Sequence, residues 1–170
     1  DGRVGDQDRR GLGAVDGDGF ADLAIGAPQD RSGAGQVIVL RGSSVGLGTA
    51  GAQSIVHPTA TSAPEHPMGE AWFGSGLAVG DFNADGRADL AASAPHAPGG
   101  GAVDVVLGGP VGLGPSRTTL TGDALGVTGT CPPGTTPYGC ERFMKILTAG
   151  DLNADGVDDL VVESHQGAGG

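Results

Sequence analysis

The stretch Asp81-Phe-Asn83-Ala-Asp85-Gly86-Arg-Ala-Asp89-Leu90 decides the fold, because variants of it occur three times along the chain. The other copies are Asp16-Gly-Asp18-Gly-Phe-Ala-Asp22-Leu23 and Asp151-Leu-Asn153-Ala-Asp155-Gly156-Val-Asp158-Asp159-Leu160. We call the segments 14–22, 81–89 and 151–159 loop one, loop two and loop three. Oxygen-bearing side chains at alternate positions, then a glycine and a further aspartate, form a spacing that suits a hard cation such as Ca²⁺. The recurrence of this phrase indicates a repeat protein.

The sequence between the loops also repeats, and aligning Asp18, Asp85 and Asp155 gives spacings of 67 and 70 residues. Each unit holds short β-rich runs separated by glycine and proline, without helical length or a 3.6-residue period. The runs are Leu23–Pro28, Gly35–Leu40, Val45–Gly48, Gln53–Val56, Trp72–Val79, Leu90–Pro95, Gly101–Leu107, Val111–Gly114, Arg117–Leu120 and Arg142–Thr148. Four strands per unit are typical of a β-propeller blade. We therefore predict an all-β fold of four-stranded antiparallel blades, with each acidic loop in the hairpin between the first two strands of its blade.

Charge and hydropathy exclude several functional classes. The net charge is −11, and ten of the twenty acidic residues lie in the three loops. Lys145 is the only lysine and no basic cluster occurs, which argues against binding to nucleic acid or to an anionic membrane. No apolar run approaches the roughly 18 residues of a transmembrane helix, so we predict no membrane insertion. The chain has no signal peptide and no initiator methionine, and we interpret it as an excerpt or a processed product.

The two cysteines, Cys131 and Cys140, bracket the turn-rich sequence Pro-Pro-Gly-Thr-Thr-Pro-Tyr-Gly. A disulfide that closes this small loop is preferred over two free thiols. Such a disulfide would fit an oxidising, extracellular compartment.

The repeats resemble the FG-GAP family, which is found in the N-terminal seven-bladed propeller of integrin α subunits and in many secreted bacterial proteins. Phe73-Gly74 matches the "FG" of the signature, Ala94-Pro95 matches the end of the "GAP", and Gly26-Ala27-Pro28 is a complete "GAP" in the first unit. The resemblance implies about two and a half blades of a seven-bladed propeller. The expected units are 1–71, with an incomplete first strand, 72–141, and a truncated 142–170; the remaining blades of a parent propeller are expected partners.

The resemblance also implies Ca²⁺ in the hairpin loops, bound by four side chains and one backbone carbonyl. The ligands in loop two would be Asp81, Asn83, Asp85, Asp89 and the carbonyl of Arg87. The ligands in loop three would be Asp151, Asn153, Asp155, Asp159 and the carbonyl of Val157. Loop one has Ala14 at the first position, which leaves Asp16, Asp18, Asp22 and the carbonyl of Phe20. We expect loop one to bind more weakly, or to recruit water or another residue such as Asp8.

The acidic loops could also be read as EF-hand loops or as plain hairpin turns. An EF-hand needs a bidentate glutamate at position 12, where the three loops have Ile25, Ala92 and Val162, and it also needs flanking helices. Plain Asp/Asn-Gly hairpin turns would explain a single copy, but three regular copies disfavour this for loops two and three. For loop one, a plain hairpin turn without a bound cation remains an alternative.

Catalytic signals are weak. Gly42-Ser-Ser44-Val-Gly46 matches a nucleophile-elbow string, but Pro110 fills the position of Ser44 in the next unit, so we interpret Ser44 as a turn residue. No pair of histidines has a zinc-site spacing. We expect His96 to be a solvated loop residue, and Trp72 and Phe73 to pack between blades.

These observations predict a non-catalytic, calcium-stabilised, extracellular propeller segment for adhesion or for recognition of a protein or glycan ligand. The alternative is an accessory part of a larger secreted hydrolase, as in glycosylphosphatidylinositol-specific phospholipase D. A third hypothesis is that several copies of the chain complete a ring, which we consider less favoured than a fragment of a longer propeller.

Overall fold

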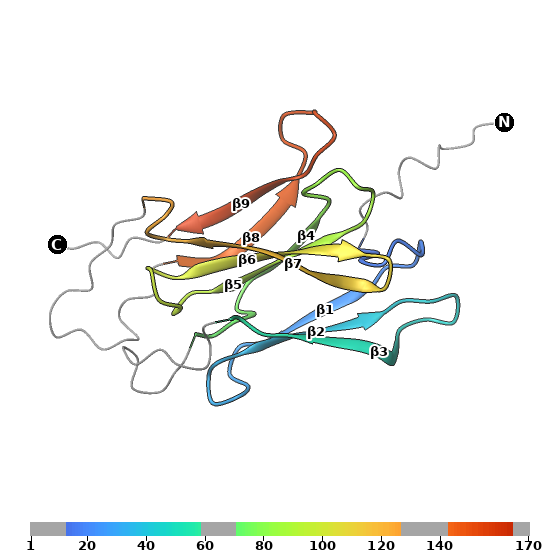
Figure 1. The fold of residues 1–170 in the computed structure, drawn as a ribbon, viewed down its shortest axis with the longest axis horizontal. Coiled ribbons are helices and arrows are strands. Elements are labelled where there is room, and N and C mark those ends of the chain that lie inside the picture. Colours follow the sequence, from blue (N-terminus) through green and yellow to red (C-terminus); the bar gives the residue numbers. More distant parts are fainter. Residues whose placement is uncertain (1–12, 59–70, 127–142, 165–170) are drawn as a thin grey trace, which may run out of the picture.

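The computed structural model describes residues 13–58, 71–126 and 143–164, and within them every regular element is a β-strand (Figure 1). Three antiparallel sheets follow one another along the chain. The strands are β1 (Leu23–Ala27), β2 (Gln36–Arg41) and β3 (Gly48–Ile55); β4 (Leu77–Gly80), β5 (Asp89–Ala94), β6 (Ala102–Gly109) and β7 (Gly112–Thr121); and β8 (Phe143–Gly150) and β9 (Asp159–Ser164). The all-β prediction is confirmed, and the sheets are parts of β-propeller blades.

The sheet β4-β5-β6-β7 is a complete four-stranded blade whose strands pair in sequence order. Two details differ from the strand runs read in the sequence. Gly112–Gly114 and Arg117–Leu120 belong to a single strand, β7, with Val111 in the turn before it, and the tip Val45–Leu47 is a hairpin turn that leads into β3. The count of four strands holds because β4, upstream of loop two, supplies the first strand of the blade.

Alternation along β5 explains how one strand serves two blade interfaces. Leu90, Ala92 and Ala94 belong to a core cluster shared with Val37 of the first sheet. Ala91, which points to the opposite face, belongs to a second cluster with Leu147 of β8. Both faces of β5 are therefore buried, and its run of small alanines lets the neighbouring sheets approach closely. Figure 1 shows the three sheets stacked in sequence order, with β4–β7 in the middle.

The "FG" dipeptide does not lie in a strand but in the contact between the first two blades. Phe73 is completely buried, and its backbone N–H donates to the carbonyl of Ala34 at 3.2 Å. Gly35 and Phe73 form a parallel bridge, and a Cβ on Gly26 would lie less than 3.0 Å from the carbonyl oxygen of Gly74. The structure thus supports the expected packing of Phe73 between blades, and places the "FG" of one blade against the "GAP" of the preceding one.

Candidate cation-binding loops

Loop two connects β4 to β5, and its side-chain oxygens accept hydrogen bonds from its own backbone. The two carboxylate oxygens of Asp81 accept from the N–H groups of Asp85 at 3.1 Å and Gly86 at 2.8 Å. Asn83 Oδ1 accepts from the same Asp85 N–H at 2.9 Å. Asp85 Oδ1 accepts from Arg87 N–H at 2.9 Å. These bonds hold the first three predicted side-chain ligands around a single short stretch of backbone.

Asp89, the last predicted ligand of loop two, anchors the loop to the blade. Its Oδ2 accepts from the N–H of Phe82 at 2.9 Å and its Oδ1 from the N–H of Gly108, on β6, at 2.7 Å. Burial raises the pKa of the Asp89 carboxyl above its usual value; the two backbone hydrogen bonds lower it, and the charges of Asp85 and Asp81 raise it further. The negative charges of Asp85 and Asp81 therefore act on the Asp89 carboxyl.

Loop three, between β8 and β9, repeats the hydrogen bonds of loop two. Asp151 accepts from Asp155 N–H at 3.1 Å and from Gly156 N–H at 2.9 Å, and Asn153 accepts from Asp155 N–H at 2.9 Å. Asp155 accepts from Val157 N–H at 2.9 Å. The matching distances indicate that the two sequences specify one loop conformation.

Two left-handed residues produce the sharp turn in each loop. Ala84 and Ala154 have φ of 59° and 62°, and they are followed two residues later by Gly86 and Gly156 with φ of 83° and 88°. A left-handed alanine is an unfavourable conformation, which is tolerated where surrounding contacts enforce it. Here the side chains at positions 1, 3 and 5 of the loop supply those contacts.

Loop one keeps the anchor but lacks the first carboxylate. Asp22 accepts from Val15 N–H at 2.7 Å and from Gly42 N–H at 2.8 Å, the same arrangement as at Asp89. Asp18 and Phe20 also keep their bonds: Asp18 N–H donates to Asp16 Oδ1 at 3.1 Å and Phe20 N–H to Asp18 Oδ1 at 2.8 Å. Ala14 stands at the position of Asp81, and among residues 13–58, 71–126 and 143–164 no side chain is seen to replace the two hydrogen bonds that Asp81 accepts in loop two.

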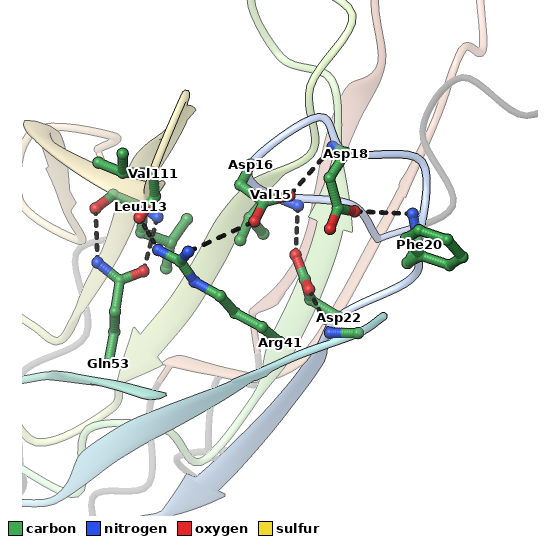
Figure 2. A network of polar contacts seen from close by, with 10 residues as sticks. Val15, Asp16, Asp18, Phe20, Asp22, Arg41, Gln53, Val111 and Leu113 are labelled. Atoms are coloured by element: carbon green, nitrogen blue, oxygen red, sulfur yellow. Dashed lines mark hydrogen bonds and ion pairs between the residues drawn. The ribbon is translucent and has the colours of Figure 1, made fainter. Parts of the chain in front are cut away.

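The guanidinium group of Arg41 lies beside Asp16 of loop one (Figure 2). Arg41, at the end of β2, lies 3.7 Å from Asp16 through its Nη1, and its Nη2 donates to the carbonyl of Val111 in the next blade. The Asp16 side chain is only 8% exposed, so this neighbouring positive charge is weakly screened. Gln53 extends the contact by donating to the carbonyl of Leu113 at 3.0 Å and accepting from its N–H at 2.8 Å.

The donor chemistry of loops two and three fits a hard cation, although the side chains are arranged around backbone N–H groups. Among residues 13–58, 71–126 and 143–164, no three His, Cys, Asp or Glu side chains form a ready metal-binding group. A carboxylate oxygen that accepts one N–H still has a lone pair for a metal. All five predicted donors in each loop are oxygens, the ligands that Ca²⁺ takes and that soft metals do not prefer.

The remaining candidates from the sequence have mixed outcomes. Ser44 lies exposed in the β2–β3 turn, as expected for a turn residue. The expectation for His96 is wrong: this histidine is only 7% exposed and stacks on Trp72 with ring centroids 4.3 Å apart. Asp8, Cys131, Cys140 and His165 lie outside the described residues. No helix in the described part of the chain is long and apolar enough to cross a membrane.

Sequence reasoning missed a buried polar cluster between the first two blades. Asp104 on β6 is completely buried and accepts from Thr119 at 2.6 Å; His57 Nδ1 lies 2.9 Å and Arg117 Nη1 3.3 Å from its other oxygen. Arg117 also donates to the carbonyl of Val56 at 2.7 Å. The residues of this polar cluster carry no sequence motif. Only the alternation of side chains along β6 and β7 indicates that Asp104 and Arg117 lie on the sheet face that packs against the preceding blade.

Comparison with known proteins gives a consistent result. Residues 15–40 and 73–106 match the family model described as FG-GAP repeat. Phosphatidylinositol-glycan-specific phospholipase D of Rattus norvegicus is 32% identical over 162 residues, and that of Homo sapiens is 33% identical over 162 residues; each alignment covers 90% of this chain and 18% of the relative. Integrin alpha-PS5 of Drosophila melanogaster is 39% identical over 87 residues, covering 51% of this chain and 8% of the relative. The chain thus spans less than a fifth of the length of these relatives.

Proposed function

Since this chain carries FG-GAP repeats folded as part of a β-propeller, we propose that it is a calcium-stabilised, extracellular recognition segment without catalytic activity of its own. The observation that supports the proposal is the shared conformation of loops two and three, in which the side chains at positions 1 and 3 accept hydrogen bonds from the same backbone N–H groups in both loops. In loop two the charges of Asp85 and Asp81 raise the pKa of Asp89, and a divalent cation would compensate those charges.

We assign calcium to loops two and three and not to loop one. In loops two and three, the first aspartate (Asp81 or Asp151) completes the donor set. In loop one that position is Ala14, and the positive charge beside Asp16 is already provided by Arg41. A cation in loop one would have fewer ligands, which disfavours its binding; the nearby guanidinium does not distinguish the loops, since Arg87 Nη1 lies 3.6 Å from Asp85 in loop two.

Calcium is expected to raise the melting temperature of the protein. Loops of this kind in extracellular modules bind with dissociation constants of about 10⁻⁴–10⁻³ M. Calcium at ten times the dissociation constant would add about 1.4 kcal/mol per site to the free energy of unfolding. Differential scanning calorimetry with calcium, magnesium and a chelator measures this shift. A melting temperature that is the same in chelator and in calcium at ten times the dissociation constant would contradict the proposal.

The number of sites is testable with one matched set of substitutions at the fifth loop position. Asp85→Asn and Asp155→Asn are each expected to remove one of two calcium ions counted by isothermal titration calorimetry, because each removes a carboxylate ligand. Asp18→Asn in loop one is expected to leave the stoichiometry at two. Loss of an ion in Asp18→Asn, or no loss in the other two variants, would refute the assignment.

A second function is favoured by the extent of the similarity to phospholipase D relatives, which covers 90% of this chain against 51% for the integrin. On this alternative the segment is an accessory propeller of a larger secreted hydrolase. Cleavage of a glycosylphosphatidylinositol anchor by the parent protein, abolished when a domain outside these 170 residues is inactivated, would favour it. Binding of a protein or glycan by a parent without hydrolase activity would favour recognition alone.

The extracellular location is part of the same proposal. Calcium sites with dissociation constants near 10⁻³ M are typical of extracellular modules. The predicted Cys131–Cys140 disulfide lies outside the described residues and stays a prediction, for which intact mass with and without reduction is the measurement.

A further inference from the structure

We propose that Asp158 is a positioning residue that holds Asp81 in place, so that loop three of one blade prepares loop two of the preceding blade for its cation. The inference rests on the proposed calcium function of these loops. It concerns a residue that lies beside the predicted ligand Asp159 but was not itself predicted to bind metal.

Asp158 forms hydrogen bonds with both the backbone N–H and the backbone carbonyl of Asp81. The N–H of Asp158 donates to the carbonyl of Asp81 at 2.9 Å, and the N–H of Asp81 donates to Asp158 Oδ2 at 2.8 Å. The approach is close, since a Cβ on the neighbouring Gly80 would lie 2.9 Å from Asp158 Oδ2. Glycine at position 80 is therefore needed for the carboxylate to reach the backbone of Asp81.

The preceding blade junction has only one of these two hydrogen bonds. There the N–H of Ala88, the eighth residue of loop two, donates to the carbonyl of Ala14, the first residue of loop one, at 3.1 Å. The backbone bond from position 8 to position 1 thus occurs at both junctions. The side-chain bond occurs only where position 8 is an aspartate, because the alanine at position 88 has no acceptor.

The residue that is held matters for the whole of loop two. The Asp81 side chain accepts the hydrogen bonds of Asp85 and Gly86 that close the loop, and it is the first predicted ligand. Asp158 is followed directly by Asp159, whose carboxylate accepts from Leu152 N–H at 3.0 Å within loop three. A change in the conformation of loop three would therefore act on Asp81 through Asp158, which would couple the two cation sites.

The experiment compares Asp158→Ala with Asp158→Asn in an Asp155→Asn background, in which loop two alone is expected to bind calcium. Alanine occupies the equivalent position 88, so the first variant is compatible with the fold. Asparagine removes the charge but keeps an oxygen that can accept from Asp81 N–H. Titration calorimetry is expected to give calcium binding about tenfold weaker for Asp158→Ala, given the usual size of a charge-assisted hydrogen bond, and within about twofold of the background for Asp158→Asn.

A metal-free measurement accompanies the titration. Hydrogen exchange of the Asp81 amide, followed by NMR in chelator, is expected to be faster in Asp158→Ala and close to the parent in Asp158→Asn. Equal weakening of calcium binding by both variants would show a charge effect and overturn the positioning role, as would unchanged binding in Asp158→Ala. Absence of calcium binding in the unsubstituted protein would instead refute the proposed function, whatever the exchange rate of Asp81.

Discussion

Replacing Gly35 with alanine is expected to lower the free energy of unfolding by about 3 kcal/mol or more, among the largest effects of any single substitution in this chain. Gly35 has φ of 79°, a conformation that costs other residues about 1–3 kcal/mol. A Cβ at this position would also lie less than 3.0 Å from the carbonyl oxygen of Phe73, which is backbone and cannot move without separating the two blades. Urea denaturation followed by circular dichroism measures the loss.

Two other glycines separate the conformational cost from the steric one. Gly46 also has positive φ, 106°, but a Cβ there would meet nothing within 4 Å, so Gly46→Ala is expected to cost only about 1 kcal/mol. Gly48 has open space and no positive φ, and Gly48→Ala is expected to change stability by less than about 0.5 kcal/mol. Equal losses for Gly35 and Gly46 would mean that the close contact between blades has no energetic role.

The close approach at Gly35 explains which parts of the fold the sequence could and could not predict. The hairpin loops and the strands after them follow from local patterns: oxygen donors at alternate positions, a glycine turn, and runs of valine, leucine and alanine. Repetition of these patterns indicated the blade. The contacts of Phe73-Gly74 with Gly35 and Gly26 join residues 38 and 48 positions apart, and nothing local in either segment specifies its partner.

The same distinction applies to the candidate sites. The position of loops two and three, in the hairpins β4–β5 and β8–β9, could be predicted from sequence because each loop lies within nine residues, while their ligand sets stay a prediction. The approach of Arg41 to Asp16 could not, since it depends on where β2 ends beside loop one. His96 was misread for a related reason: it follows a proline turn, which favours exposure, but the fold places Trp72 against its ring.

Replacing Arg117 with methionine is expected to destabilise the protein by about 3 kcal/mol, because it leaves a buried carboxylate without its cation. Asp104 has no exposed surface, and among the described residues its oxygens have polar contacts with Thr119, His57 and Arg117. The substitution also removes the hydrogen bond from Arg117 to the carbonyl of Val56, which ties the second blade to the end of the first. Thermal and urea unfolding of the variant measure the loss.

Removing both charges is expected to restore only part of that stability, because His57 and Thr119 lose Asp104 as their hydrogen-bond partner. In the double variant Asp104→Leu/Arg117→Met no buried charge remains, and apolar replacements of buried ion pairs are commonly neutral or stabilising. The apolar choice at position 104 has a precedent in this chain, since register places Ile38 of β2 where Asp104 lies in β6. Arg31→Met, at an exposed arginine, is the matched control and is expected to change stability by less than about 0.5 kcal/mol. If Arg117→Met costs no more than Arg31→Met, the buried cluster does not hold the blades together. If the double variant is as unstable as Arg117→Met, the loss comes from packing, from the Val56 contact and from the hydrogen bonds of His57 and Thr119 to Asp104, and not from an uncompensated buried charge.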